Sequence, residues 1–455
     1  MIKKILPILL LISSFTYGQH TIKGAMSPNI DTDWLILYKI EGTKQVFVNN
    51  TIIKKDSILI GGRNEAVGSF EIKLPSSAKS GTYRATYRLE GASFIDFVYN
   101  KENVSFIFNP DYPQESVAYT ASKENTFYSQ YITDITAVQQ KLDSIQVAVL
   151  KDPTLNLKEN YKEAYNKVNA TQNKYINLAK DKYVAPFVSA SARSNPPEIL
   201  TSVNDYLANI KNTFFDKLDF SNKTLVNSSF LTNRILDYVF YINYSDDQQQ
   251  QQILNKNSIE TVLSKIKSQA YQRDIIQFLI EQFESSKNLE IIDYLFDNHY
   301  NKLPIELQNA KFKTEKQALF ATEVGRVAPD FSWSENGRNR KLSTLNDAET
   351  YVLVFWSTSC SHCLKEIPEL HSYMKTKPNM KVIAFALEND AFAWEVYKKN
   401  NLPGWHNVLG LNKWENKTAR TYQVYSTPTY LVLDKSKKII AKPNAIKDVK
   451  EFLDK

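Results

Sequence analysis

The spacing of apolar residues changes its period twice along the 455-residue chain, and these changes constrain the fold more than any other feature. From residue 19 to residue 112, short runs rich in β-branched and aromatic residues are separated by Asn, Asp, Gly, Ser and Pro. Strand-forming runs that alternate with turn residues at this spacing predict a β-sandwich-like domain. We expect its strands to include residues 34–40, 69–74, 82–89 and 104–108.

Between residues 113 and 324 the apolar residues recur three and four positions apart, as expected of helices with one buried face. One such seam runs through residues 128–149. After a break at residues 151–153, a second seam runs through residues 157–178. Two helices joined by a short loop predict a helical hairpin. The central part of the chain is therefore predicted to be an all-helical domain.

From residue 325 to residue 455, strand patterns and helix patterns alternate. The runs at 351–356, 381–387 and 429–434 are almost continuously apolar, and helical stretches lie between them. Such strands are buried on both faces, which predicts a mostly parallel or mixed sheet covered by helices on each side. The whole chain is thus predicted to be an α+β multidomain protein with a C-terminal α/β domain.

The first 18 residues have the composition of a secretory signal peptide. Two lysines precede a short apolar run at residues 5–12, and small residues follow where a signal peptidase requires them. We expect cleavage before Gln19. No cysteine comes directly after the apolar run, so we do not expect a lipid-anchored lipoprotein. The mature chain is therefore expected to be soluble and periplasmic, in a compartment where disulfides persist.

The charge pattern gives no sign of nucleic-acid binding. The formal net charge is +7, from 56 basic and 49 acidic side chains. The lysines are dispersed, and no basic stripe is interleaved with aromatic residues as in nucleic-acid-binding modules. We expect a solvated charged surface and no nucleic-acid partner.

The only two cysteines of the sequence, Cys360 and Cys363, follow a predicted strand and begin a predicted helix. A helix N-terminus offers free amide groups and a dipole that favour an anion, so the pKa of Cys360 should fall below about 8.5. His362, when protonated, would lower it further. Cys363 lies one helical turn along, more enclosed, and can attack a mixed disulfide formed at Cys360. The pattern predicts a two-thiol redox centre.

Three other interpretations of the cysteine pair stay open. A structural disulfide is the first, although closing so small a loop contributes only about 2 kcal/mol in the loop-closure model. The second is a copper or zinc site, in which the two thiols and His362 are joined by His371 or His406. The third is a peroxidase of the peroxiredoxin class, which would require proline where this chain has Leu353.

The C-terminal segment resembles the thioredoxin-fold thiol–disulfide oxidoreductases of the exported TlpA/ResA type. This resemblance implies a thioredoxin fold and disulfide exchange with protein substrates. The motifs that carry it are VAPDF (327–331), the strand ending in FW (355–356), CSHC (360–363), KEIPEL (365–370) and STPTYLVLD (426–434).

The resemblance also implies a proton shuttle. Ordinary thioredoxins carry an aspartate on the preceding strand, where this chain has Val354. Glu366 instead matches the buried acid of the TlpA/ResA type, which implies that it moves the proton of Cys363. The catalytic residues are thus expected to be Cys360, Cys363 and Glu366.

Four further residues are expected to bind the substrate or tune the cysteines. Thr427 and Pro428 match the family's cis-proline loop, which lies against the sulfurs and leaves the Thr427 backbone free to pair with a substrate strand. Trp356 precedes the redox pair, and His362 lies between its two cysteines. Reducing thioredoxins carry Gly-Pro between the cysteines, and a histidine at the second position is shared with more oxidising relatives, so the working direction stays open.

We expect a reductant that needs no organic cofactor, since the disulfide between Cys360 and Cys363 itself carries the electrons. The expected partners are protein thiols and disulfides and an upstream membrane electron donor or acceptor. Residues 19–324 are expected to select substrates, to dock, or to form a homodimer. The alternative is a non-enzymatic envelope protein that binds a ligand and uses its C-terminal fold to sense redox state or to hold copper or zinc.

Overall fold

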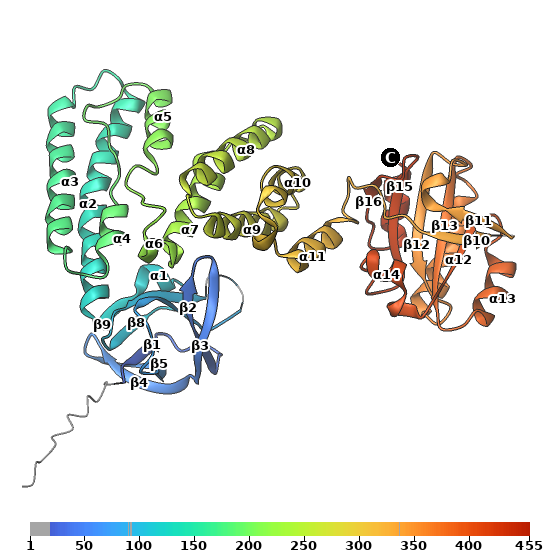
Figure 1. Cartoon of the computed structure of the whole chain (residues 1–455), viewed down its shortest axis with the longest axis horizontal. Coiled ribbons are helices and arrows are strands. Elements are labelled where there is room, and N and C mark those ends of the chain that lie inside the picture. The colour runs from blue at the N-terminus through green and yellow to red at the C-terminus, as the bar shows by residue number, and fades with distance from the viewer. Residues whose placement is uncertain (1–18, 90, 92, 336) are drawn as a thin grey trace, which may run out of the picture. The chain divides into compact units, whose positions relative to one another are not determined.

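The computed structural model describes residues 19–89, 91, 93–335 and 337–455. The predicted signal peptide lies outside the described residues. The chain divides into two compact units, one ending at Leu307 and the other beginning at Gln308. In Figure 1 the second unit begins near α11 and continues through the orange and red elements. Within the described part of the chain, no helix combines the length and the apolar character needed to cross a membrane.

The first unit begins with two β-sheets, with strand orders β4-β5-β1-β8-β9 and β3-β2-β6-β7. Neighbouring strands pair antiparallel, except that β1 and β8 run parallel. The strands are β1 (Thr21–Met26), β2 (Trp34–Glu41), β3 (Lys44–Ile52), β4 (Lys54–Ile60), β5 (Arg63–Lys73), β6 (Gly81–Thr86), β7 (Phe94–Tyr99), β8 (Val104–Phe108) and β9 (Ala118–Ala121).

Apolar residues of both sheets form one shared core. In β8, for example, the buried Val104, Phe106 and Phe108 alternate with half-buried neighbours. A period of two is what a strand requires when one of its faces lies on a core. The sandwich-like β architecture predicted from the sequence is confirmed.

Helices make up the rest of the first unit. Leu142 of α2 packs against Tyr161 and Val168 of α3, so the two seams form the predicted hairpin. The helices are α1 (Pro113–Ser116), α2 (Lys123–Lys151), α3 (Lys158–Leu178), α4 (Ala185–Ala190), α5 (Val203–Thr213), α6 (Lys223–Val226), α7 (Ser229–Leu236), the π-helix η1 (Asp237–Ile242), α8 (Gln248–Lys265), α9 (Gln269–Ser285), α10 (Leu289–Asn298), η2 (Tyr300–Lys302) and η3 (Ile305–Leu307).

The division into domains at residues 112 and 324 stays a prediction, and the structure differs from it in two details. Strand β9 lies beyond residue 112, because Ala118 and Tyr119 pair with β8 and extend that sheet. Helix α11 (Ala310–Phe320) lies in the second compact unit rather than with the preceding helices.

The second unit is built on a five-stranded sheet with the order β14-β13-β12-β15-β16. Strands β12, β13 and β14 run parallel, and β15 and β16 are antiparallel to their neighbours. The elements after α11 are β10 (Ser332–Glu335), β11 (Arg338–Lys341), η4 (Leu342–Thr344), β12 (Thr350–Trp356), α12 (Ser361–Met374), β13 (Met380–Glu388), α13 (Phe392–Asn401), β14 (His406–Leu411), η5 (Lys413–Glu415), α14 (Lys417–Thr421), β15 (Thr429–Asp434), β16 (Ile439–Ala441) and α15 (Ile446–Leu453).

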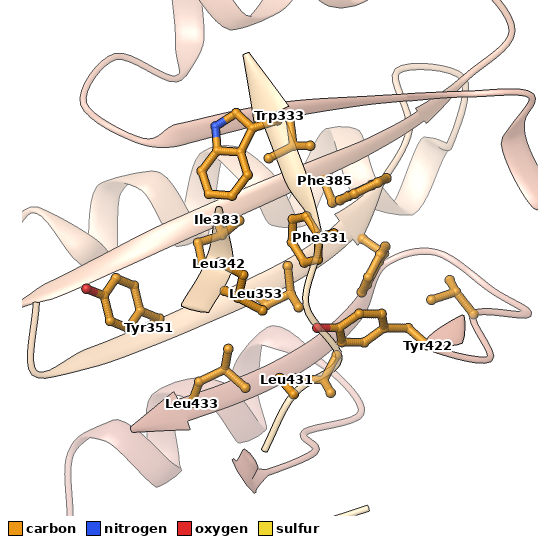
Figure 2. Close-up of a cluster of buried hydrophobic side chains, with 14 of the residues drawn as sticks. Phe331, Trp333, Leu342, Tyr351, Leu353, Ile383, Phe385, Tyr422, Leu431 and Leu433 are labelled. Atoms are coloured by element: carbon orange, nitrogen blue, oxygen red, sulfur yellow. The ribbon is translucent and has the colours of Figure 1, made fainter. Parts of the chain in front are cut away.

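The central strand β12 is buried on both faces. Tyr351 and Leu353 point into the cluster shown in Figure 2, whereas Val352 and Val354 join a second cluster on the other face. The second cluster includes residues of α12, α13 and α15. Burial on both faces explains the continuous apolar run in the sequence. The turn from β12 into α12 therefore lies at the carboxyl end of the parallel strands, where α/β folds place their functional groups.

Candidate active site

The two cysteines lie at the start of α12, and both are free thiols. Cys360 is the N-cap residue, and its Sγ accepts a hydrogen bond from the backbone N–H of Cys363 at 3.2 Å. The same thiol donates to the backbone carbonyl of Thr427 at 3.3 Å. Cys360 is partly exposed and Cys363 is completely buried. One accessible thiol that can attack a disulfide, with a second thiol close behind it, suits disulfide exchange in two steps.

The surroundings shift the two thiol pKa values in opposite directions. Burial raises the pKa of Cys360, but hydrogen bonds with Cys363, with Thr427 and with the backbone of His362 outweigh it and bring the pKa below its ordinary value. Burial, together with the neighbouring Cys360, raises the pKa of Cys363 to about 12. A hydrogen bond between two thiols favours the charge on one of them at the expense of the other. Of the two thiols, Cys360 is therefore the one that ionises more readily.

Glu366 lies on α12, three residues after Cys363, and is half-buried. Its Oε2 accepts hydrogen bonds from the Tyr430 hydroxyl at 2.8 Å and from the backbone N–H of Ile446 at 3.1 Å. Burial, followed by the hydrogen bond to Glu366, raises the pKa of Tyr430, and the charge of Cys363 adds to this effect. Tyr430 thus interacts with both groups, and two donors fix the Glu366 carboxylate on the helix that carries Cys363.

The loop before β15 completes the site. The Thr427–Pro428 peptide bond is cis. The Thr427 carbonyl accepts the hydrogen bond from the Cys360 thiol, which places this loop against the accessible sulfur. The structure therefore brings Thr427 and Cys360 together from positions that are 67 residues apart in the chain.

Two of the predicted tuning residues occupy different environments. The Trp356 side chain is completely buried and packs against Tyr397, with ring centroids 5.2 Å apart and ring planes inclined by 51°. It is enclosed in the apolar cluster that contains Cys363. The side chain of His362 is exposed to solvent at the start of α12.

Three residues at the site were not anticipated from the sequence. Tyr430 carried a weak signal, because it falls on the same face of its strand as other buried residues. Glu388 is a buried acid at the end of β13, and Thr358 donates its backbone N–H to Glu388 Oε1 at 2.6 Å. Lys413 donates to the hydroxyl of Ser359 at 3.0 Å. No sequence pattern marks Lys413, since its position depends on a turn.

The metal interpretation finds no support in the arrangement of side chains. Within the described ranges, no group of three or more His, Cys, Asp or Glu residues is placed to hold a metal ion. His406 instead lies between two carboxylates, 3.2 Å from Glu335 Oε2 and 3.0 Å from Asp347 Oδ2. His371 packs on the ring of Trp405. Both residues considered as a fourth ligand thus contact groups other than the thiols.

Comparison with known proteins finds a family model that matches part of the second unit, and several similar proteins. Residues 347–439 match a family model described as thioredoxin-like. The thiol-disulfide oxidoreductase ResA of Geobacillus thermodenitrificans is 28% identical over 149 residues, which cover 32% of this chain and 83% of that protein.

Solved structures are also similar to the chain. A domain of a possible thiol-disulfide isomerase from Cytophaga hutchinsonii is 30% identical, with a TM-score of 0.26, and the match covers 29% of this chain and 90% of that domain. A thioredoxin-like protein from Bacteroides caccae is 16% identical, with a TM-score of 0.35, and the match covers 58% of this chain and 97% of that protein.

Proposed function

Because the C-terminal part of the chain is a thioredoxin-like domain of the thiol–disulfide oxidoreductase type, we propose that this protein reduces disulfides in other proteins. The proposed nucleophile is Cys360 and the proposed resolving thiol is Cys363. The observation that carries the proposal is the position of the Cys360 sulfur, which caps α12 and accepts an amide hydrogen bond at 3.2 Å. A sulfur in this position is stabilised as the thiolate, the form that attacks disulfides.

The reaction proceeds in two balanced steps. In the first, the Cys360 thiolate attacks one sulfur of the substrate disulfide, a mixed disulfide forms, and the other substrate sulfur leaves as a thiolate. In the second, Cys363 loses its proton and attacks Cys360, which releases the second substrate thiolate. Two electrons pass to the substrate, and the protein ends with a Cys360–Cys363 disulfide. An external dithiol must then reduce that disulfide.

The second step explains the need for a proton acceptor. A pKa of about 12 leaves Cys363 protonated at neutral pH, so its attack requires a base. Glu366 is the proposed base, because two hydrogen bonds to its Oε2 hold its carboxylate in place on the helix that carries Cys363. In the reverse direction the same carboxyl group would return the proton.

The loop at Thr427 and Pro428 is proposed to bind the substrate chain next to the sulfur. The Thr427 backbone can pair with an extended segment, as in strand addition to a sheet edge. The Cys360 thiol gives up its hydrogen bond to the Thr427 carbonyl when it reacts, and that group then becomes available to the substrate.

The remaining features of the sequence complete the proposal. We propose export to the periplasm through the predicted signal peptide, a membrane-bound electron donor, and no organic cofactor. The β and helical parts of residues 19–324 are proposed to select substrates or to dimerise. Deletion of these residues should preserve the reduction of a generic disulfide and abolish turnover of the natural substrate.

Reduction of insulin by dithiothreitol, followed as turbidity, tests the proposal. The wild-type protein should accelerate precipitation of the insulin chains, and the Cys360→Ser variant should not. Equal rates for the two proteins would refute the oxidoreductase function. A Cys363→Ala variant should accumulate the mixed disulfide with its natural substrate in the periplasm, where mass spectrometry can identify that substrate.

A further inference from the structure

The turn that connects β12 to α12 is held by two charged side chains of opposite sign. Glu388, the last residue of β13, is 5% exposed and accepts the backbone N–H of Thr358 at 2.6 Å. Lys413, the first residue of η5, donates to the Ser359 hydroxyl at 3.0 Å. These two residues come from separate elements and contact consecutive residues just before Cys360. They therefore hold the turn at two adjacent points.

Because Glu388 is buried, its hydrogen bond with Thr358 restrains the turn more than a surface contact would. Removing a carboxylate from water is costly unless hydrogen bonds replace its hydration. A surface glutamate could relax away from the turn at little cost, but a carboxylate that is 5% exposed cannot. The short bond to Thr358 is therefore part of what keeps this charge in the fold, and it restrains the turn in return.

The backbone at Lys413 points to a similar restraint. Asn412 and Lys413 both have positive φ angles, 69° and 41°, which residues other than glycine adopt at a cost. Such conformations persist where the surrounding structure demands them. Here they carry the half-buried lysine side chain to Ser359, whose hydroxyl also lies 3.0 Å from the hydroxyl of Ser357.

The restrained turn is in contact with both sulfur-bearing residues. The backbone N–H of Cys360 donates to the Ser357 carbonyl at 3.2 Å. A hydrogen bond from the Ser357 backbone also lowers the pKa of Cys363, against the larger effect of burial. A displacement of the turn would therefore move the Cys360 sulfur away from the amide groups at the start of α12.

We propose that Glu388 and Lys413 are positioning residues, which hold the turn so that the N-terminus of α12 stabilises the Cys360 thiolate. The inference rests on the proposed function, in that it takes Cys360 as the nucleophile. Lys413 contributes a positive charge as well as a contact, whereas the charge of Glu388 opposes a thiolate. Glu388 can therefore favour the thiolate only through its hydrogen bond to Thr358. This hydrogen bond and the negative charge of Glu388 have opposite effects on the stability of the thiolate.

Several titratable groups lie on the elements packed around Cys360, and each could influence the thiolate. They are His362, Cys363 and Glu366 on α12, Glu388 on β13, Tyr397 on α13, Lys413 on η5 and Tyr430 on β15. The loop before β15 adds the carbonyl of Thr427. All except Glu388 and Lys413 stay unchanged in the experiment.

The experiment measures the rate of alkylation of Cys360 by iodoacetamide from pH 4 to pH 10 in the full-length reduced protein. The curve of rate against pH has an inflection where Cys360 ionises. Glu388→Ala should move this inflection to higher pH by about one unit, because the turn is released. Glu388→Gln keeps an acceptor for Thr358 and removes the negative charge, so the inflection should stay or move slightly lower. Opposite responses of these two variants are the signature of positioning.

Lys413 has its own matched pair of variants. Lys413→Met should raise the inflection by about half a unit, since a partly exposed charge is screened by solvent and salt. Lys413→Arg should leave it near the wild-type value. Lys417→Met removes an exposed lysine from the same segment and should change nothing.

The outcomes separate this inference from the proposed function. If Glu388→Ala and Glu388→Gln both lower the inflection, Glu388 acts only through its charge and the inference is wrong. It is also wrong if every variant keeps the wild-type inflection while circular dichroism shows that all are folded. If the inflections shift as expected but the wild type does not reduce insulin, the positioning role stands and the oxidoreductase function is refuted.

Discussion

Iodoacetamide at pH 7 should label the reduced protein at Cys360 and leave Cys363 almost unmodified. The thiolate is the reactive form of cysteine, so the rates follow the fraction of each thiol that is ionised. Cys360 is partly exposed and has a lowered pKa, whereas Cys363 is completely buried and has a pKa of about 12. The two thiols differ although they are three residues apart.

The magnitude follows from these values. At pH 7 a thiol with a pKa of about 12 is ionised to roughly one part in 10⁵, whereas an ordinary cysteine with a pKa near 8.5 is ionised to about 3%. Because the pKa of Cys360 lies below its ordinary value, the ratio of rates should be on the order of a thousandfold or more. Burial of Cys363 hinders the reagent and increases the ratio further.

The assay is tryptic digestion after a short exposure to the reagent, with the label located by fragmentation in the mass spectrometer. Labelling in guanidinium should remove the difference, because both thiols are then exposed. The Cys360→Ser variant should remain almost unlabelled in its native state. If Cys363 in the native wild type reacts within tenfold of Cys360, the assignment of the two roles is refuted.

Three further predictions concern residues around the thiols and behind the sheet. Glu366→Gln should slow the release of thionitrobenzoate from a mixed disulfide at Cys360 by about 100-fold at pH 6, since general acid–base catalysis contributes about 10²- to 10⁴-fold. A wild-type rate would exclude Glu366 as the proton acceptor of Cys363. Tyr430→Phe removes a hydrogen bond to the Glu366 carboxylate and should lower the free energy of unfolding in urea by about 1.5–3 kcal/mol, with Tyr373→Phe as a milder control. For Asp347, burial raises the pKa, but the charge of His406 and hydrogen bonds bring it below its ordinary value. The folded-state pKa is then lower than the unfolded one, so this stabilisation is present above about pH 4 and is lost as the pH falls, and Asp347→Asn should flatten the acid limb of the stability curve.

Most of the architecture was accessible from local patterns. Strand β12 is apolar from Tyr351 to Trp356 because both of its faces are buried, and the alternation in β8 reflects burial on one face. The apolar residues that recur along α2 and α3 likewise predicted that these two helices pack against each other. The boundaries were less accessible, because the pairing of β9 with β8 depends on a contact and not on a run of strand-forming residues.

For the site, the sequence by itself determined that the two thiols lie at the N-terminus of a helix. A strand pattern and a short turn precede CSHC, and a helical pattern follows it, so the cysteines must lie where the helix begins. Only the tertiary structure decided what surrounds them. Tyr430, Glu388 and Lys413 lie on other strands and turns, and they reach the site because the sheet order brings its carboxyl edge together. The same distinction applies to Trp356, which is near the cysteines in sequence but is completely buried. Local backbone conformation determines which amide groups lie near a side chain a few residues away. The pairing of strands that are distant in the sequence determines which charged side chains lie near it.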